Sequence, residues 1–85
     1  MTVQKVKLFA LTTCSHCKAV KKLLARHNID VEVVNVDNLE RDDRDAAIKE
    51  VKQYNERVSF PTTVIGDKVI VGYKADQIKK TLEQN

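Results

Sequence analysis

The hydrophobic pattern changes its period just after Leu11, and this change constrains the fold more than any other feature of the sequence. The segment from Val3 to Leu11 ends in the near-continuous apolar run Leu8-Phe9-Ala10-Leu11, which is typical of a strand buried on both faces. From Ser15 to His27 the apolar residues recur at helical spacing with lysines between them; they are Ala19, Val20, Leu23 and Leu24. The pattern predicts a strand and then a helix, which Asn28 closes.

A β-branched run follows the first predicted helix; it consists of Val31, Val33, Val34 and Val36. A strand, helix, strand order of this length implies a parallel, right-handed crossover. Asp37 and Asn38 then offer side chains that would cap a second helix. The helix itself is predicted by a charged segment with one apolar stripe, formed by Ala47, Ile48, Val51 and Tyr54.

The C-terminal part combines a hairpin with a last helix. Residues 62–65 and 69–71 are rich in β-formers, and Gly66-Asp67 and Lys68 between them predict an antiparallel pair. After Gly72, an apolar stripe marks a helix that ends near Glu83; its members are Ala75, Ile78 and Leu82. The order βαβαββα predicts an α/β fold of the thioredoxin-like type, a four-stranded mixed sheet with flanking helices. In a chain of 85 residues without linker or repeat, we expect one domain over residues 1–85.

Two cysteines placed three residues apart carry the predicted chemistry. Cys14 lies where the first strand gives way to the first helix, so the free N–H groups of the first turn favour its thiolate. Such placement can lower a cysteine pKa from about 8.5 to between roughly 3.5 and 7.5. Cys17 lies on the same face, at a Cα separation of about 5 to 6 Å that suits a disulfide. We therefore expect Cys14 to attack a target disulfide and Cys17 to resolve the mixed disulfide, through a redox-active Cys14–Cys17 disulfide and without a tightly bound cofactor.

The residues around the cysteines leave alternatives open. His16 either stabilises the Cys14 thiolate as an imidazolium or is an exposed residue of the first turn. Lys18, four residues after Cys14, is a second candidate cation or a solvated lysine. Half a zinc site is a further interpretation, but a second Cys or His pair is missing. We therefore expect no metal at this motif.

Composition and the start of the chain indicate the class of protein and the compartment in which this chemistry would operate. Hydrophobic residues make up 42% and charged residues 32%, which is typical of a folded soluble protein. The start of the chain has neither a signal-peptide pattern nor a membrane span, so we expect a cytoplasmic monomer. In a reducing compartment, paired cysteines are more often catalytic than structural. A net charge of +3 does not imply nucleic acid, although four basic residues gather on the first predicted helix: Lys18, Lys21, Lys22 and Arg26.

Three ordered landmarks resemble the glutaredoxin family over essentially the whole chain: Cys14-Ser15-His16-Cys17, Ser59-Phe60-Pro61 and Gly72-Tyr73-Lys74-Ala75-Asp76. Pro61 is the sole proline, and its position before a β-rich run by itself predicts a trans proline at the start of a strand. The resemblance instead implies a cis Phe60-Pro61 bond. It also implies that the backbone of Phe60 holds the cysteinyl part of glutathione or of a protein substrate. The candidate substrate-binding residues are Thr13, His16, Phe60, Pro61, Gly72, Tyr73 and Asp76.

Departures from the family pattern bear on the electron donor. Glutaredoxins usually carry proline and tyrosine between the cysteines and a lysine where this chain has Leu11, so a contact to a glutathione carboxylate is missing. Gly72-Tyr73 stands for the double glycine, and only Asp76 remains of an acidic pair; it either receives the glutathione amine or caps the last helix. Residues 72–78 are similar to the redoxins that supply electrons to ribonucleotide reductase and are recharged by thioredoxin reductase.

This resemblance leaves three functions to be compared. The leading one is a thiol-disulfide oxidoreductase that acts on protein or small-molecule disulfides and is recharged by a thioredoxin-reductase-type flavoprotein or by glutathione. Alternatives are a glutathione-dependent deglutathionylating glutaredoxin and, from another class, a metal or iron-sulfur carrier that uses Cys14. A noncatalytic module that binds an acidic partner through its lysine face is a further possibility. No nucleic-acid or membrane partner is expected.

Overall fold

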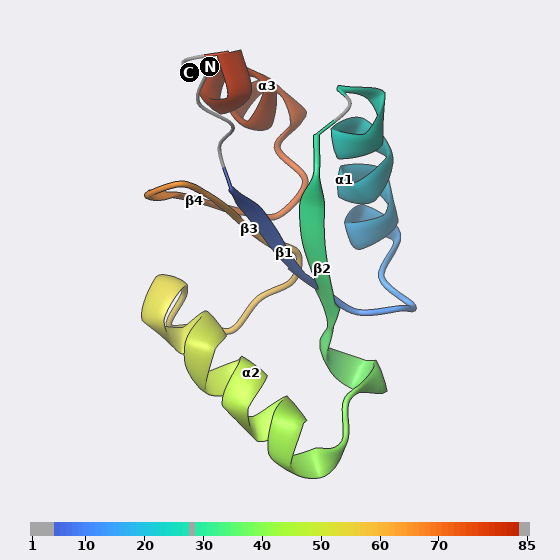
Figure 1. The fold of residues 1–85 in the computed structure, drawn as a ribbon, viewed down its shortest axis with the longest axis vertical. Coiled ribbons are helices and arrows are strands. Elements are labelled where there is room, and N and C mark those ends of the chain that lie inside the picture. The colour runs from blue at the N-terminus through green and yellow to red at the C-terminus, as the bar shows by residue number, and fades with distance from the viewer. Residues whose placement is uncertain (1–4, 28, 84–85) are drawn as a thin grey trace.

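Residues 5–27 and 29–83 are described by a computed structural model (Figure 1). The elements are β1 (Val6–Ala10), α1 (Ser15–Arg26), β2 (Val31–Asn35), the 3-10 helix η1 (Val36–Asn38), α2 (Arg41–Tyr54), β3 (Thr62–Ile65), β4 (Lys68–Val71) and α3 (Ala75–Glu83). The predicted order of strands and helices is confirmed, with η1 as an addition. The fold is the expected thioredoxin-like one.

The sheet has the strand order β2-β1-β3-β4, so β1 and β3 are the two inner strands. β1 pairs in parallel with β2, and β1–β3 and β3–β4 are antiparallel. The register sets Phe9 beside Thr62, and Thr62 beside Val71. The end of β1, the start of β3 and the end of β4 therefore meet at one edge of the sheet. This edge carries the Cys14 loop, Pro61 and Gly72.

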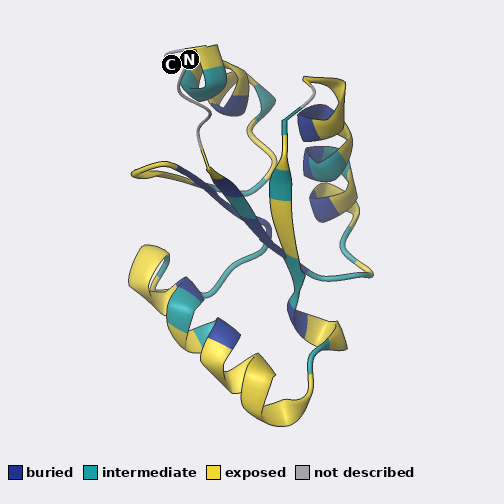
Figure 2. Cartoon of the chain, viewed as in Figure 1, coloured by how far each residue is buried: buried dark blue, intermediate teal, exposed yellow. Residues whose placement is uncertain are grey.

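Helices cover both faces of the sheet (Figure 1). α1 and α3 pack on one face over a cluster formed by Val6, Leu8, Ala10, Cys17, Val20, Leu23, Leu24, Ile65, Ile70 and Ile78. α2 packs on the other face over a smaller cluster formed by Phe9, Val36, Ala47, Val51 and Val64. Successive side chains of a strand point to opposite faces, so the apolar run of β1 supplies both clusters. Figure 2 shows that each helix turns its buried residues toward the sheet and leaves its outer side exposed.

Several predicted boundaries and caps are wrong. The first strand ends at Ala10, because the carbonyl of Leu11 accepts a turn hydrogen bond from the backbone N–H of Cys14 at 3.2 Å. Val36 opens η1 instead of ending β2, and β4 begins at Lys68, one residue earlier than expected. Val3 and Asn28 lie outside the described residues.

The predicted capping of α2 by Asp37 and Asn38 is wrong as well. Both residues belong to η1, and α2 follows Glu40, whose side chain makes no capping hydrogen bond. The carboxylate of Asp37 binds Thr12 instead. The outer surface of α2 is charged, and Tyr54 at its end stays 40% exposed although its ring lies 6.3 Å from that of Phe9. No helix within residues 5–27 and 29–83 is long and apolar enough to cross a membrane.

Candidate active site

The loop between β1 and α1 is held by hydrogen bonds to η1 and by a turn of its own. The carboxylate of Asp37 accepts hydrogen bonds from the backbone N–H of Thr12 at 3.0 and 3.1 Å and from its hydroxyl at 2.6 Å. These bonds hold the pKa of Asp37 below its ordinary value, and the bond from the Thr12 hydroxyl has the largest effect. The carboxylate is therefore charged at neutral pH. Within the loop, the carbonyl of Leu11 accepts a turn hydrogen bond from the N–H of Cys14 at 3.2 Å. The bonds to η1 and this turn together therefore fix the segment that presents Cys14.

Cys14 is the N-cap residue of α1. Its Sγ accepts a hydrogen bond from the backbone N–H of Cys17 at 3.3 Å, in the manner of a capping side chain. The thiol of Cys17 donates a further hydrogen bond, which is the largest cause of a lowered pKa at Cys14; the backbone N–H groups of Cys17 and His16 lower it further. Each of these groups stabilises the charged form, so Cys14 is the thiol of the pair that ionises more readily.

Cys17 has the opposite character. It is 0% exposed and belongs to the cluster between the sheet and α1. Burial is the largest cause that raises the pKa of Cys17 to about 11, and the hydrogen bond to Cys14 adds to it. The charge of Lys21, which donates to the Asn35 side chain at 3.0 Å, opposes this shift in part. Both cysteines are free thiols in this structure, which is the dithiol form of the site.

The pH dependence of Cys14 alkylation reports this arrangement. Because only the thiolate reacts, we expect the iodoacetamide rate to be half-maximal below the ordinary cysteine pKa of about 8.5. Cys17→Ala removes the thiol donor and should move the half-point to higher pH. A Cys14→Ser control, which leaves only Cys17, should react negligibly at pH 8. An unchanged half-point in Cys17→Ala would contradict the role assigned to the Cys17 thiol.

The Phe60-Pro61 peptide bond is cis, as the resemblance implied. Pro61 is buried, and its carbonyl accepts a hydrogen bond from the N–H of Gly72 at 2.8 Å, which joins the two loops at this edge of the sheet. Gly72 has φ +86°, a conformation that side chains other than glycine rarely adopt. Phe60 is half-buried and packs against both clusters. Among the described residues, its backbone N–H and C=O have no hydrogen-bond partner.

The other candidate residues surround the cysteines less closely. Thr13 and the side chain of His16 are exposed, and His16 acts on Cys14 through its backbone N–H. Asp76 is the second residue of α3, so it lies in the first turn and does not cap the helix as expected. A hollow of about 400 Å³ brings it together with Tyr73, Lys74, Ala75 and Gln77. That hollow does not include either cysteine.

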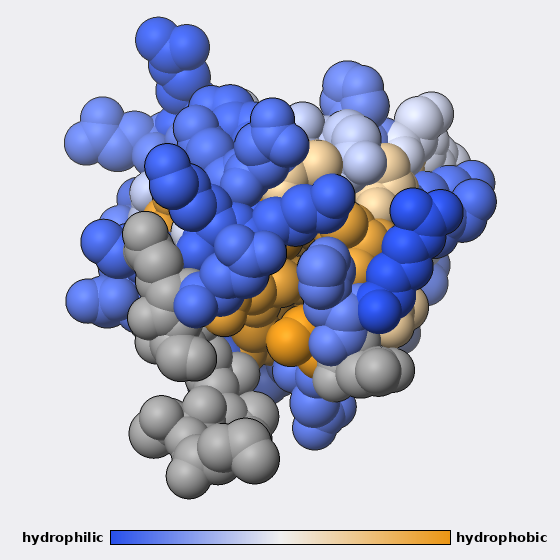
Figure 3. Space-filling model, turned by 90° about the horizontal axis from the view of Figure 1, so that it is seen from above, coloured by the Kyte–Doolittle hydropathy of each residue, from blue (hydrophilic) through white to orange (hydrophobic). Residues whose placement is uncertain are grey.

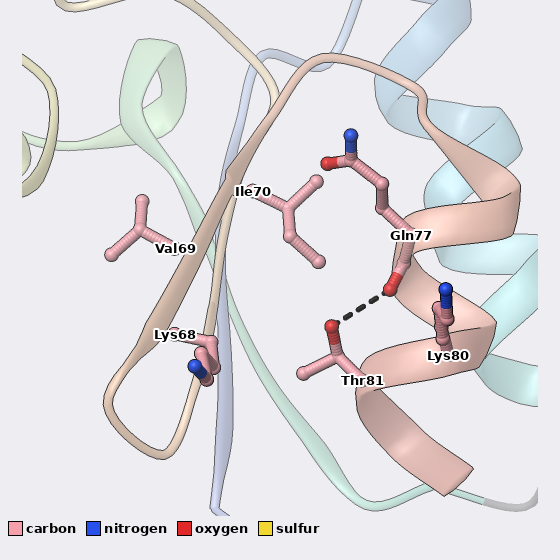
Figure 4. Close-up of a pocket in the computed structure, with 6 residues that line it drawn as sticks. All are labelled: Lys68, Val69, Ile70, Gln77, Lys80 and Thr81. Carbon is pink, nitrogen blue, oxygen red and sulfur yellow. Dashed lines mark hydrogen bonds between the residues drawn. The ribbon is translucent and has the colours of Figure 1, made fainter. Parts of the chain in front are cut away.

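Sequence reasoning missed two contacts near the cysteines, that of Asp37 with Thr12 and that of Lys21 on α1 with Asn35 at the end of β2. The sequence predicts Asp37 as a helix cap, because a polar residue before a helix is the ordinary signal for one. It predicts Lys21 as part of a solvated face, whereas the structure shows Lys21 half-buried and bound to Asn35. Neither pairing has a local sequence signal, since each partner comes from a different element. A hollow of about 250 Å³ between β4 and α3 lies near the β3–β4 turn, remote from this edge (Figure 4).

A thioredoxin-like sheet, a cysteine pair at the start of α1 and a cis-proline loop beside it define a dithiol redoxin. The family model described as Glutaredoxin matches residues 6–70. The chain belongs to the glutaredoxin family. Within the described ranges, no three His, Cys, Asp or Glu residues lie close enough together to hold a metal ion.

Similar proteins agree with this assignment. The crystal structure of Methanosarcina acetivorans methanoredoxin is 44% identical at a TM-score of 0.90, over 94% of this chain and 85% of that one. An uncharacterised glutaredoxin-like 8.6 kDa protein in the rubredoxin operon of Clostridium pasteurianum is 31% identical, over 93% of this chain and 99% of that protein. Escherichia coli NrdH-redoxin, 22% identical at a TM-score of 0.74 over 89% and 92% of the two chains, shares the fold.

Proposed function

We propose that the protein reduces disulfides by a two-step exchange. The Cys14 thiolate attacks one sulfur of a target disulfide, and the other sulfur leaves as a thiolate and takes up a proton. Cys17 then loses its proton and attacks Sγ of Cys14, which releases the second target thiol. The target gains two electrons and two protons, and the protein is left with a Cys14–Cys17 disulfide.

The observation that carries this proposal is the unequal environment of the two thiols. The hydrogen bonds from Cys17 and from backbone N–H groups favour the thiolate at Cys14, while burial keeps Cys17 protonated. Cys14 is therefore the thiol that ionises more readily and attacks first, and Cys17 stays protonated until it resolves the mixed disulfide. Family membership supports the general role of a thiol-disulfide oxidoreductase.

The Phe60 backbone would position the target. Its N–H and C=O are without partners in the described part of the chain, and they lie next to the cis-proline at the edge that also carries Cys14. An extended substrate segment could pair with both groups as a short added strand, which would hold its disulfide in line with Sγ of Cys14. This mode suits protein disulfides, because every peptide offers the same backbone groups.

Trapping the mixed disulfide tests the proposal. Cys17→Ser should attack a target normally and then stall, because the resolving thiol is gone. We expect a one-to-one adduct with oxidised insulin after acid quenching, detected by mass spectrometry and removed by dithiothreitol. The wild type should show only a transient adduct. Adduct formation that persists in the Cys14→Ser/Cys17→Ser double variant, or none in Cys17→Ser, would refute the assignment.

Our expectation for the electron donor rests on the contacts that glutathione would need in order to bind. Glutathione carries two carboxylates and one ammonium, so tight binding requires a cation for each carboxylate and an acid for the amine. Leu11 cannot supply a cation, because its side chain is apolar and packs against the cluster under α2. Tyr73 stands at the second position of the double glycine, and its side chain adds bulk beside the γ-glutamyl end. The exposed Asp76 remains as an acid for the amine.

We therefore expect a thioredoxin-reductase-type flavoprotein to recharge the oxidised protein faster than glutathione does. The loss of one charged contact weakens glutathione binding by about tenfold or more, and we expect a rate difference of that size. Coupled NADPH oxidation with each system measures this directly. A Leu11→Lys variant should narrow the difference by improving the glutathione rate alone. Efficient turnover with glutathione and glutathione reductase, but none with the flavoprotein, would overturn the expectation. We place the cycle in the cytoplasm, in a monomer.

A further inference from the structure

The outer side of α1 carries a row of cations that begins at the reactive cysteine. Counting in steps of four from Cys14 gives Lys18, Lys22 and Arg26; because residues four apart are neighbours on a helix surface, they form a row that winds slowly around α1. All three are exposed. Lys21, the fourth basic residue of α1, is half-buried and bound to Asn35, so it does not belong to the row. We call Lys18, Lys22 and Arg26 the basic stripe.

α1 has an excess of positive charge that α2 lacks. The helix has four basic residues and no acidic one, whereas α2 on the other face of the sheet has four of each sign. The charges of α2 therefore sum to zero, and their field largely cancels. Nothing on α1 cancels the field of the basic stripe. Figure 3, which looks onto the end of the molecule where α3 and α1 lie, shows hydrophilic side chains on both sides of an apolar strip.

An aromatic ring lies beside the far end of the stripe. Lys22 and Arg26 line a hollow of about 120 Å³ together with Ala19, Leu23 and Tyr73. Tyr73 follows Gly72 at the edge of the sheet that carries the site, and it is 45% exposed. The hollow thus combines two cations with apolar surface. Such a surface is complementary to a segment that alternates carboxylates with apolar side chains.

We infer that the basic stripe and Tyr73 form a docking surface for an acidic segment of the disulfide-bearing protein substrate. With a helix rise of about 1.5 Å per residue, the three cations lie about 6, 12 and 18 Å along α1 from Cys14. Carboxylates at such distances from the target disulfide would be attracted while the disulfide meets Sγ. The inference rests on the proposed function and adds the substrate class: disulfides flanked by acidic residues.

Two disulfide-linked peptide dimers test the surface, one with glutamates on both sides of each half-cystine and one with glutamines instead. We expect wild-type kcat/KM to be about tenfold higher for the glutamate peptide in about 10 mM salt, where the Debye length is about 30 Å. The preference should vanish in about 1 M salt, where that length is about 3 Å. Lys22→Glu/Arg26→Glu should reverse it at low salt.

The control variant Lys49→Glu/Lys52→Glu makes the same charge change on exposed residues of α2, behind the sheet. It should keep most of the preference. Equal losses in the two variants, or a preference that survives Lys22→Glu/Arg26→Glu, would overturn the docking surface. Unchanged reduction of the glutamine peptide by both variants would show that the cysteine chemistry is intact. Failure of the wild type to reduce either peptide would instead refute the proposed function and the docking surface with it.

Discussion

A Cys14→Ser variant is expected to lose insulin reduction by dithiothreitol almost completely, by on the order of a thousandfold or more relative to the wild-type acceleration. The hydroxyl of serine is not ionised at neutral pH, and the groups that hydrogen-bond to Cys14, which are the Cys17 thiol and the backbone N–H groups of Cys17 and His16, act as donors and not as bases. The remaining thiol cannot replace it, since it is 0% exposed and its pKa is about 11. The measurement is the turbidity of the released insulin chain against time.

A matched control separates chemistry from folding. Ser15→Ala changes the neighbouring, exposed residue by one hydroxyl group and should stay within about twofold of the wild-type rate. Cys14→Ser should unfold at nearly the same urea concentration as the wild type, because a serine oxygen can also accept the Cys17 N–H bond at the N-cap. Equal rates in wild type and Cys14→Ser would remove Cys14 from the mechanism.

The sheet could be predicted from sequence because each of its elements has a local pattern. The apolar run of β1, the β-branched run of β2 and the Gly66-Asp67 turn each specify their own conformation, and short connections leave few ways to join them. The ends of elements were less predictable. Val36 continues the β-branched run of β2, but Thr12 binds Asp37, the next residue, and the chain turns into η1 there.

The candidate site was also predictable only in part. The cysteine pair could be placed at the start of a helix because strand and helix patterns meet there, and helix geometry then supplies the N–H groups around Sγ. The bonds from Thr12 to Asp37 and from Lys21 to Asn35 join residues 25 and 14 positions apart. No periodicity connects such positions. The hollow beside Tyr73 was hidden for the same reason, since α1 and the loop after β4 meet only in the folded chain.

Phe9→Ala is expected to lower the free energy of unfolding by about 3 to 5 kcal/mol, as large-to-small changes in cores do. Phe9 is 0% exposed and is the largest member of the cluster under α2. The buried members of that cluster from α2 are the small residues Ala47 and Val51, and Ile48 packs against it half-buried, so little side-chain volume can replace the lost ring. The ring also lies 5.2 Å from Nζ of Lys7, which binds Glu50 of α2 at 2.8 Å. Urea unfolding of the wild type and the variant measures the difference.

Phe9→Leu keeps most of the apolar volume and should cost about 1 kcal/mol, so the cluster can be tested even if Phe9→Ala does not fold. Val33→Ala, on an exposed position of β2, should change stability by less than either. Because Cys14 and Cys17 lie against the opposite cluster, Phe9→Leu should reduce insulin near the wild-type rate at temperatures where it is folded. A loss of rate that exceeds the unfolded fraction would mean that α2 supports the cysteine pair through the sheet. A cost no larger than that of Val33→Ala would mean instead that α2 is held by its charged contacts, such as the ion pair of Lys7 with Glu50.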